Sequence, residues 1–443
     1  MVDQAYYPEG MSDELFADLD RRPVNAAPTE GPLRLETPNR TQVELVPTDL
    51  EALLPLGHAA RLVWRFVEGL DLRRFQAAIR SREGRAGRAA TDPRVLLALV
   101  LYATIKGIGS AREIARLCYS DDAYRWLRGG VGINHHTLSD FRMQHQAALD
   151  DLVTQSITVL LERRVVTLTR VTQDGTKVRA NAGMRSFRRA DRLRACAQAA
   201  RAQVRAVAAT AAEGGETARA LAAQRRAAAE QVARVDEALA QLPAVEAAKQ
   251  RNRSKAVARV STTDPDARVM KMPDGGYRPA YNVQFATDMA SDVVVGVAVT
   301  NTGSDQQALI PMQEQIAQRT GGTPAATLVD GGYVSTEGIQ DAAARGTTLY
   351  TPIPKKNAPG SGSTAGQDAA VTAWRDRMTT EAAKAVYRAR AGTAERLNAD
   401  TRVHRTLATV PVRGLTKVLM WALWAALAQN MMRTMAIVPH LMT

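Results

Sequence analysis

The spacing of apolar residues changes several times along the chain. Between His58 and about Arg163 they recur at helical intervals, and glycines mark the helix ends. The pattern predicts a helical domain over residues 46–164, after a polar arm (1–45) that we expect to be extended or poorly ordered. The clearest helical segments are ARLVWRFVEGL (60–70), PRVLLALVLYATI (93–105), AREIARLCY (111–119) and DDLVTQSITVLLERR (150–164).

β-Branched residues become frequent in VVTLTRVTQDGTKVRANAG (165–183), which favours an extended strand. Asp174 interrupts this run and is followed at once by Gly175. An Asp-Gly pair is a common turn between hairpin strands, so a surface turn is one interpretation. The other is a carboxylate that a rigid strand holds to bind a metal ion, because burying it without a partner would cost stability.

Residues 184–260 are alanine-rich and helical in pattern, and EGGE (213–216) divides them. They predict an antiparallel helical hairpin inserted after the first strand. The insert has 16 Lys and Arg against 7 Asp and Glu, so it carries nine of the chain's 13 excess positive charges. This one-sided charge favours an arm that faces DNA, and a dimerising coiled coil is the alternative.

Strand patterns return after the insert and alternate with helices. The order predicts an α+β or mixed α/β fold with a mixed sheet flanked by helices, formed by residues 165–183 and 261–443. Its predicted parts are a strand pair (277–288 and 292–305), a helix (306–319), a buried strand (326–332), a short helix, a strand (347–354), a flexible linker (357–366) and helices over 368–405.

The charge of the whole chain indicates its partner. Its 443 residues carry a net charge of +13, which favours a polyanion, and nucleic acid fits better than an acidic membrane surface. No basic amphipathic helix adjoins an apolar anchor. The apolar run 415–432 contains Lys417, Gln429 and Asn430, so we expect a buried core helix there.

The cysteine and histidine content excludes two further classes of site. Cys118 and Cys196 are the only cysteines, too few for a disulfide framework or a cysteine-based zinc site. Six scattered histidines without a His-x-x-x-His pair argue against a zinc enzyme. The N-terminal sequence is acidic and lacks a signal pattern, so we expect a cytoplasmic protein.

One segment of the helical domain resembles a DNA-reading element. GVGINHHTLSDFRMQH (130–145) predicts a turn and then a helix capped by Thr137. This fits the second helix of a helix-turn-helix, whose first residues would face DNA. Arg142 is the candidate DNA contact there, and plain packing within an all-α domain is the alternative.

Two further acids occur in settings that suggest chemistry. Asp330 ends an apolar strand and precedes Gly331, as Asp174 precedes Gly175. Glu395 lies in YRARAGTAERLNADTR (387–402), where helical spacing places it in one stripe with basic residues. Three carboxylates of this kind can hold two divalent ions for phosphoryl transfer, and Mg²⁺ prefers such oxygen ligands.

The motifs together resemble those of bacterial insertion-sequence transposases of the DDE type, over roughly residues 45–435. The matching segments are TQDGTKVRANAG (172–183), STTDPDARVMKMPDGGYRPAYNVQ (261–284), TLVDGGY (327–333) and Tyr387-x-x-Arg390 leading to Glu395. Four residues separate Arg390 from Glu395, one more than in a widely shared form of the signature, and the related branch with an Asp-Gly-Thr first motif has this spacing.

The resemblance implies a ribonuclease H-like catalytic core with Asp174, Asp330 and Glu395 as catalytic and metal-binding triad. It also implies two Mg²⁺ ions per active site, with Mn²⁺ as a substitute. The candidate DNA contacts are Tyr387, Arg390, Arg402, Lys177 and Arg142.

The expected function is a transposase that binds the terminal repeats of its element, cleaves the end phosphodiester and joins the 3′-OH to target DNA. Double-stranded DNA would be the partner, with a homodimer forming on it and the protein located on the nucleoid when bound. An inactive DNA-binding or architectural protein on the same scaffold is one alternative. A metal-dependent nuclease without strand joining is the other.

Overall fold

The computed structural model describes residues 49–81, 84, 89–213, 218–253, 256–353 and 368–438. The N-terminal arm (1–45) and the linker (357–366) expected from the sequence lie outside these residues. Residues 49–443 belong to one unit of the chain.

The segment before the sheet is helical, as its apolar spacing predicts. Its central helix, α3, is buried along almost its whole length. Asp92 caps this helix by accepting a hydrogen bond from the amide of Arg94, and Pro93 occupies the first turn, where no amide donor is needed. The helices are α1 (Ala59–Glu68), α2 (Arg73–Ala77), α3 (Pro93–Ile105), α4 (Ala111–Ser120), α5 (Asp122–Arg128), α6 (His135–Gln144) and α7 (Gln146–Glu162).

The start of α6 differs from the prediction. The helix begins at His135, two residues before Thr137, and Asn134 is its cap. The Asn134 side chain accepts a hydrogen bond from the amide of His136. Asparagine caps helices at least as well as threonine, so the earlier of the two polar residues sets the helix start.

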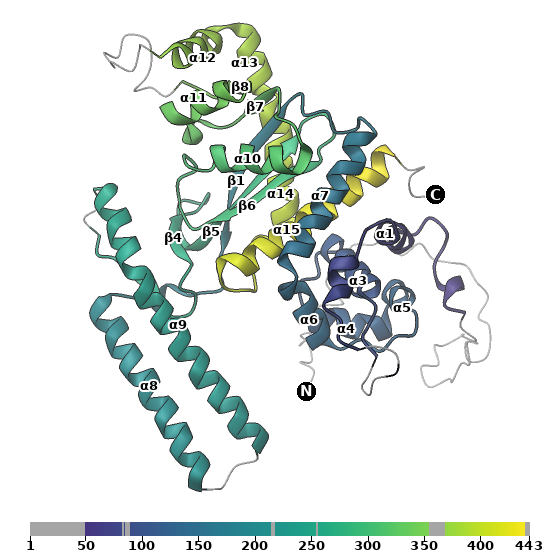
Figure 1. The fold of residues 1–443 in the computed structure, drawn as a ribbon, viewed down its shortest axis with the longest axis vertical. Coiled ribbons are helices and arrows are strands. Elements are labelled where there is room, and N and C mark those ends of the chain that lie inside the picture. Colours follow the sequence, from purple (N-terminus) through teal and green to yellow (C-terminus); the bar gives the residue numbers. More distant parts are fainter. Residues whose placement is uncertain are drawn as a thin grey trace, which may run out of the picture. The chain divides into compact units, whose positions relative to one another are not determined.

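The sheet is mixed, and β1 (Val171–Arg179) lies at its centre (Figure 1). On one side β1 pairs antiparallel with β5 (Tyr277–Asp288), and on the other it runs parallel to β7 (Ala326–Leu328). β7 is parallel to β8 (Thr348–Tyr350). Along the far edge of β5 lie first β4 (Arg268–Lys271) and then β6 (Val294–Thr300), both antiparallel to it.

The Asp-Gly pair of the first strand is not a turn. Asp174 and Gly175 lie inside β1, opposite Phe285 and Gln284 of β5. The hairpin-turn interpretation is therefore wrong, and the extended strand that the β-branched residues favour is confirmed. The strand begins only at Val171, because Leu168 has a φ of +53° and bends the chain before it.

The basic insert forms two packed helices, α8 (Ala190–Glu213) and α9 (Ala218–Arg251) (Figure 1). Before and after them, β2 (Phe187–Arg188) and β3 (Val260–Ser261) pair antiparallel and bring the two ends of the insert together. A small apolar cluster, including Leu193 and Leu242, fills the hairpin near this root.

Helix α15 (Leu415–Ile437) is the buried core helix expected from its sequence. It packs against α3, α7 and β6, so one apolar core joins the helical region to the sheet. Asn430 lies within this core and is fully satisfied, because its side chain pairs with both the amide and the carbonyl of Val294 at 2.8 and 2.9 Å. None of the described helices is long and apolar enough to cross a membrane.

The remaining helices follow the β5–β6 hairpin in the sequence and pack against several strands of the sheet. A second apolar cluster, centred on Trp374 and Tyr333, packs the segment after β7 and the helices before α14 against β8. The helices that pack against β8 are α11 (Thr336–Ala344), α12 (Ala369–Thr379) and α13 (Glu381–Arg388). Helix α10 (Leu309–Thr320) packs against β6 and α7, and α14 (Arg390–His404) packs against β1.

Candidate active site

Asp174 projects from the central strand toward α14, and both of its carboxylate oxygens are hydrogen-bonded there. Arg390 Nη2 donates to Oδ1 at 2.7 Å, and Asn398 Nδ2 donates to Oδ2 at 2.7 Å. The Asp174 side chain is 19% exposed and that of Arg390 is 11% exposed, so water screens this ion pair only weakly.

The surroundings of Asp174 oppose its negative charge. Burial raises the pKa of this carboxyl, the Arg390 guanidinium lowers it, and Asp330 and Asp305 raise it further. A half-enclosed acid with two acidic neighbours needs a positive partner to stay ionised. In this structure Arg390 is that partner.

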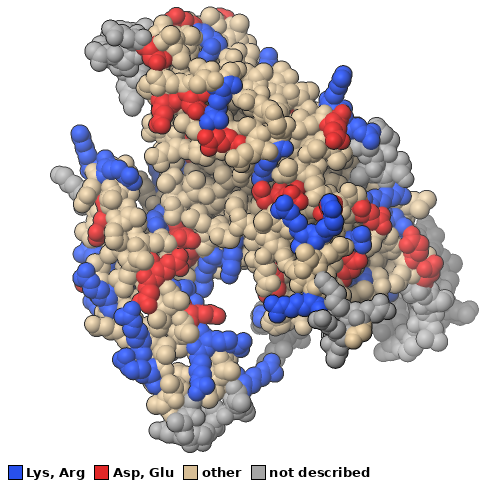
Figure 2. Space-filling model, viewed as in Figure 1, with Lys and Arg blue, Asp and Glu red and all other residues tan. Residues whose placement is uncertain are grey.

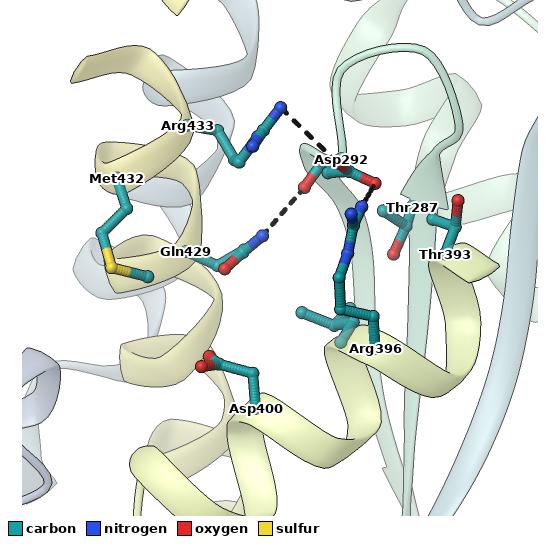
Figure 3. Close-up of a pocket in the computed structure, with 9 residues that line it drawn as sticks. Thr287, Asp292, Thr393, Arg396, Asp400, Gln429, Met432 and Arg433 are labelled. Atoms are coloured by element: carbon teal, nitrogen blue, oxygen red, sulfur yellow. Dashed lines mark hydrogen bonds and ion pairs between the residues drawn. The ribbon is translucent and has the colours of Figure 1, made fainter. Parts of the chain in front are cut away.

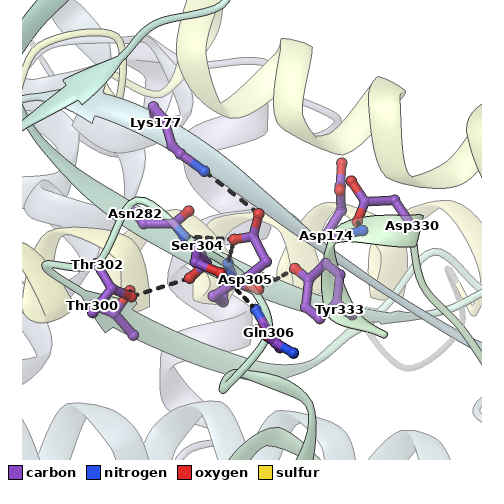
Figure 4. Close-up of polar contacts among 12 residues, drawn as sticks. Asp174, Lys177, Asn282, Thr300, Thr302, Ser304, Asp305, Gln306, Asp330 and Tyr333 are labelled. Atoms are coloured by element: carbon purple, nitrogen blue, oxygen red, sulfur yellow. Dashed lines mark hydrogen bonds and ion pairs between the residues drawn. The ribbon is translucent and has the colours of Figure 1, made fainter. Parts of the chain in front are cut away.

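Asp330 is the second residue after β7 and lies beside Asp174 (Figure 4). Its Oδ1 accepts a hydrogen bond of 2.7 Å from the amide of Gly332, which caps a single 3₁₀ turn and holds the carboxylate in place. Asp174 lies within β1 and Asp330 lies just past the end of β7, 156 residues later in the sequence. The two acids meet because β1 and β7 are parallel neighbours.

Glu395 shares a cavity with Asp174 but does not join the acidic pair. The cavity, of about 520 Å³, is lined by Asp174, Glu395 and Asn398 together with basic residues, among them Lys177, Lys271 and Arg402. Glu395 itself is exposed. Within the part of the chain that the structure describes, no three His, Cys, Asp or Glu side chains converge closely enough to hold a metal ion.

Asp305 belongs to the same acidic group, although the sequence reasoning missed it. Its Oδ1 accepts hydrogen bonds from Asn282 Nδ2 at 2.6 Å and Gln284 Nε2 at 2.7 Å, and its Oδ2 lies 3.5 Å from Lys177 Nζ (Figure 4). Like Asp174 and Asp330 it is associated with a core strand, since it follows β6 by a few residues. The position of Asp305 shortly after a predicted strand could have identified it from the sequence.

Gly175 leaves room for this network. A Cβ atom on residue 175 would lie 2.3 Å from Gln284 Nε2, 2.7 Å from Asp305 Oδ1 and 2.8 Å from Asn282 Oδ1. These polar side chains therefore press directly on the β1 backbone. Any larger residue next to Asp174 would displace them.

The residues around Glu395 occupy two helices instead of one. Tyr387 is near the end of α13, and α14 begins at Arg390 after a break at Ala389. The break lets Tyr387 pack on the apolar cluster around β8 while Arg390 reaches Asp174. Burial raises the pKa of Tyr387, and the nearby Arg390 lowers it.

The other candidate DNA contacts differ in accessibility. Arg402 and Lys177 line the cavity next to Asp174, although Lys177 is paired with Asp305. Arg142 is only 5% exposed and lies with its guanidinium over the ring of Trp421, 4.6 Å from the centroid. The side chain of Arg142 is thus not on an open surface of α6.

The opposite face of α14 is fixed by a second ionic cluster (Figure 3). Asp292, in the β5–β6 turn, pairs with Arg396 of α14 and lies 3.5 Å from Arg433 of α15. Gln429 of α15 also donates to the Asp292 carbonyl at 3.2 Å. The cluster connects α14 to the β5–β6 turn and to α15. It therefore helps to fix the helix that carries Arg390 and Asn398 next to Asp174.

The donors near Asp174 suit a hard divalent cation. They are the carboxylate oxygens of Asp174 and Asp330 and the Oδ1 atom of Asn398, which is buried and has no hydrogen-bond partner. A cation among them would neutralise the acids that now raise the pKa of Asp174. By donor chemistry these residues fit a hard divalent cation, which Asp174 and Asp330 would hold.

Comparison with known families gives two matches along the chain. Residues 48–144 match the family described as transposase domain (DUF772), and residues 360–435 match the transposase DDE domain family. The first covers α1 to α6, and the second includes α14 with Arg390, Glu395 and Arg402. No curated protein and no solved structure matches the chain.

Proposed function

We propose that this chain, which belongs to the insertion-sequence transposases of the DDE type, binds the terminal repeats of a mobile element. It would then cleave the end phosphodiester and join the 3′-OH to target DNA. Asp174, Asp330 and Glu395 would form its catalytic triad. The observation that carries the proposal is the meeting of Asp174 and Asp330 beside Arg390, above a cavity that Glu395 also lines.

The sheet supports a ribonuclease H-like core in this proposal. Its strands run antiparallel from β6 through β5 to β1 and then parallel through β7 and β8, with helices packed against them. This arrangement places the end of β7, which Asp330 follows, beside the part of β1 that carries Asp174.

The residues of this chain would position the DNA. Two Mg²⁺ ions, or Mn²⁺ in their place, would activate the attacking oxygen and stabilise the leaving oxygen. Asp174 and Asp330 would hold the metal, and Glu395 would complete the ligand set from α14. Arg390 would exchange its carboxylate partner for the scissile phosphate, since a guanidinium binds either group through two parallel hydrogen bonds. Lys177, Arg402 and Tyr387 would contact adjacent phosphates.

The charge distribution supports double-stranded DNA as partner. Lys and Arg side chains project along the helical hairpin on the face that Figure 2 shows. Five of the insert's basic residues precede Ala195 and five follow Ala248, and the β2–β3 pairing brings these two ends together at the root. We propose a homodimer on DNA, in the cytoplasm and on the nucleoid.

Incubation with a DNA fragment that carries one end of the element, target DNA and Mg²⁺ tests the function. We expect nicked element ends and products joined through the 3′-OH. Nicking without joining would identify the metal-dependent nuclease instead. Binding of the fragment without either product would identify the inactive DNA-binding protein.

A further inference from the structure

A second cavity lies between the helical region and the segment that leads into α15. It has a volume of about 730 Å³ and is lined by residues of α4, α6, α15 and the stretch from Thr406 to Val412. Four of its lining residues are basic or can become so: Arg112, His135, His136 and Arg142. Among the described residues that line it, none is acidic.

Arg142 is the most unusual member of this lining. Its Nη1 donates to the carbonyl of Gly109 at 2.9 Å, and its side chain has no carboxylate partner among the described residues. Burial lowers its pKa to about 10. The Gly109 carbonyl and the face of the Trp421 ring replace part of its hydration, but no counter-charge does, and burying an unpaired charge costs free energy.

Three equally buried arginines of the same chain show the usual arrangement. Arg61, Arg319 and Arg405 are 7–8% exposed, and each pairs with a carboxylate. Their acids are Glu51, Asp150 and Asp400. Arg142 therefore departs from the rule that this chain follows elsewhere, and it does so where it faces a cavity.

The titratable residues that line the cavity with Arg142 add positive charge instead of a counter-charge. The rings of His135 and His136 lie with centroids 4.1 Å apart. Burial lowers the pKa of His135, and His136 and Arg112 lower it further, so these groups repel one another's charge. An anion in the cavity would relieve this repulsion and supply the counter-charge that Arg142 lacks.

We propose that this cavity binds a backbone phosphate of duplex DNA, with Arg142 donating from inside and Arg112 and His136 from the rim. The inference rests on the proposed function, because it assigns the anion to DNA. A phosphate bound here contacts both the helical region and the segment next to α15. It therefore positions one DNA molecule on both parts of the chain.

The test compares a double variant, Arg112→Gln with His136→Gln, with the control Arg116→Gln on the same helix. Arg112 and His136 are exposed, so the changes spare the core. Arg116 is exposed too, but it already pairs with Glu113 at 2.6 Å. Affinity for a short DNA duplex is measured over a series of KCl concentrations.

We expect the double variant to bind DNA several-fold more weakly at low salt, with a slope of log K against log [KCl] that is smaller by about 1, as for one lost phosphate contact. The control should keep the wild-type slope. Arg142→Met should also lose affinity yet unfold at or above the wild-type temperature, because it removes a buried charge that has no acidic partner. Wild-type slopes in both the double variant and Arg142→Met would overturn the proposal.

A second measurement distinguishes a DNA phosphate from a free anion as the ligand of the cavity. Unfolding temperatures are measured in inorganic phosphate and in chloride at equal ionic strength. A phosphate-specific rise in the wild type, without any change in DNA affinity in the variants, would identify a free-anion site and overturn the DNA assignment. If the wild-type protein bound no DNA at all, the proposed function itself would fail. The unfolding temperatures in phosphate and in chloride would then show whether the cavity binds an anion.

Discussion

Arg390 Nη2 lies 2.7 Å from Asp174 Oδ1, so the arginine that begins α14 neutralises the acid at the centre of the sheet. The two residues are 216 positions apart in the sequence. Their pairing means that the group proposed to grip phosphate and the group proposed to hold metal occupy each other's binding position. Binding of a cation by Asp174 and of a DNA phosphate by Arg390 would break this ion pair.

Replacing Arg390 by lysine tests the geometry of this arrangement. Lysine keeps the charge but cannot make two parallel hydrogen bonds to a phosphate. Because misplacement by about 1 Å can cost roughly a hundredfold in rate, we expect single-turnover cleavage to fall by about that factor, with a much smaller loss of end binding. Arg388→Lys, on the exposed end of α13, is the matched control. Cleavage at the wild-type rate would remove Arg390 from the active site.

Asp174→Asn should abolish cleavage and leave DNA binding intact or tighter, because it removes a negative charge near the phosphates. Mg²⁺ should raise the unfolding temperature of the wild-type protein and not of the variant, since a ligand stabilises only the state that binds it. Both are measured on the same preparations. Equal stabilisation of the two proteins by Mg²⁺ would contradict the metal assignment.

Asp305→Asn should disturb the floor of the site. An amide has one acceptor oxygen, so it can still accept from Asn282 and Gln284 but then turns an NH2 group toward Lys177. Leaving a buried donor unpaired costs about 1–3 kcal/mol. We expect a lower free energy of unfolding in urea and at least a tenfold loss of cleavage, since Lys177 loses its partner. Asp341→Asn, which breaks the surface pair with Arg345, is the control. Normal cleavage by a destabilised Asp305→Asn protein would limit Asp305 to a structural role.

The basic root of the helical hairpin should contribute to DNA affinity more than its distal part. Arg192→Gln with Arg194→Gln alters the root, and Arg225→Gln with Arg226→Gln makes the same change in charge farther along; all four residues are exposed. We expect a smaller salt dependence of DNA binding for the first pair only. Unchanged binding by both, with a weakened dimer in sedimentation, would favour the coiled-coil interpretation of the insert.

Patterns within one segment predicted the elements of the fold well. The helical region, the β5–β6 hairpin, the two insert helices and the buried helix at 415–432 all follow from local apolar spacing. The start of β1 and the cap of α6 could not be predicted as well, because a positive φ at Leu168 and a choice between Asn134 and Thr137 depend on tertiary contacts.

Only some residues of the candidate site could be predicted from the sequence. The sequence pointed to Asp174 and Asp330, which the parallel pairing of β1 and β7 brings together. It gave no indication that Asn398 would bond to Asp174, because amides on a polar helix are common and uninformative. The unpaired charge of Arg142 is likewise visible only when the burial of Arg142 is known.

The packing of α15 against both the helical region and the sheet has a consequence for how the chain is made. Side chains of α3, α7 and β5 form one core with those of Leu415–Ile437, which are synthesised last among them. During translation the earlier elements lack the surface that covers them. Completion of the core therefore waits until this helix has left the ribosome, and the nascent chain exposes apolar surface until then.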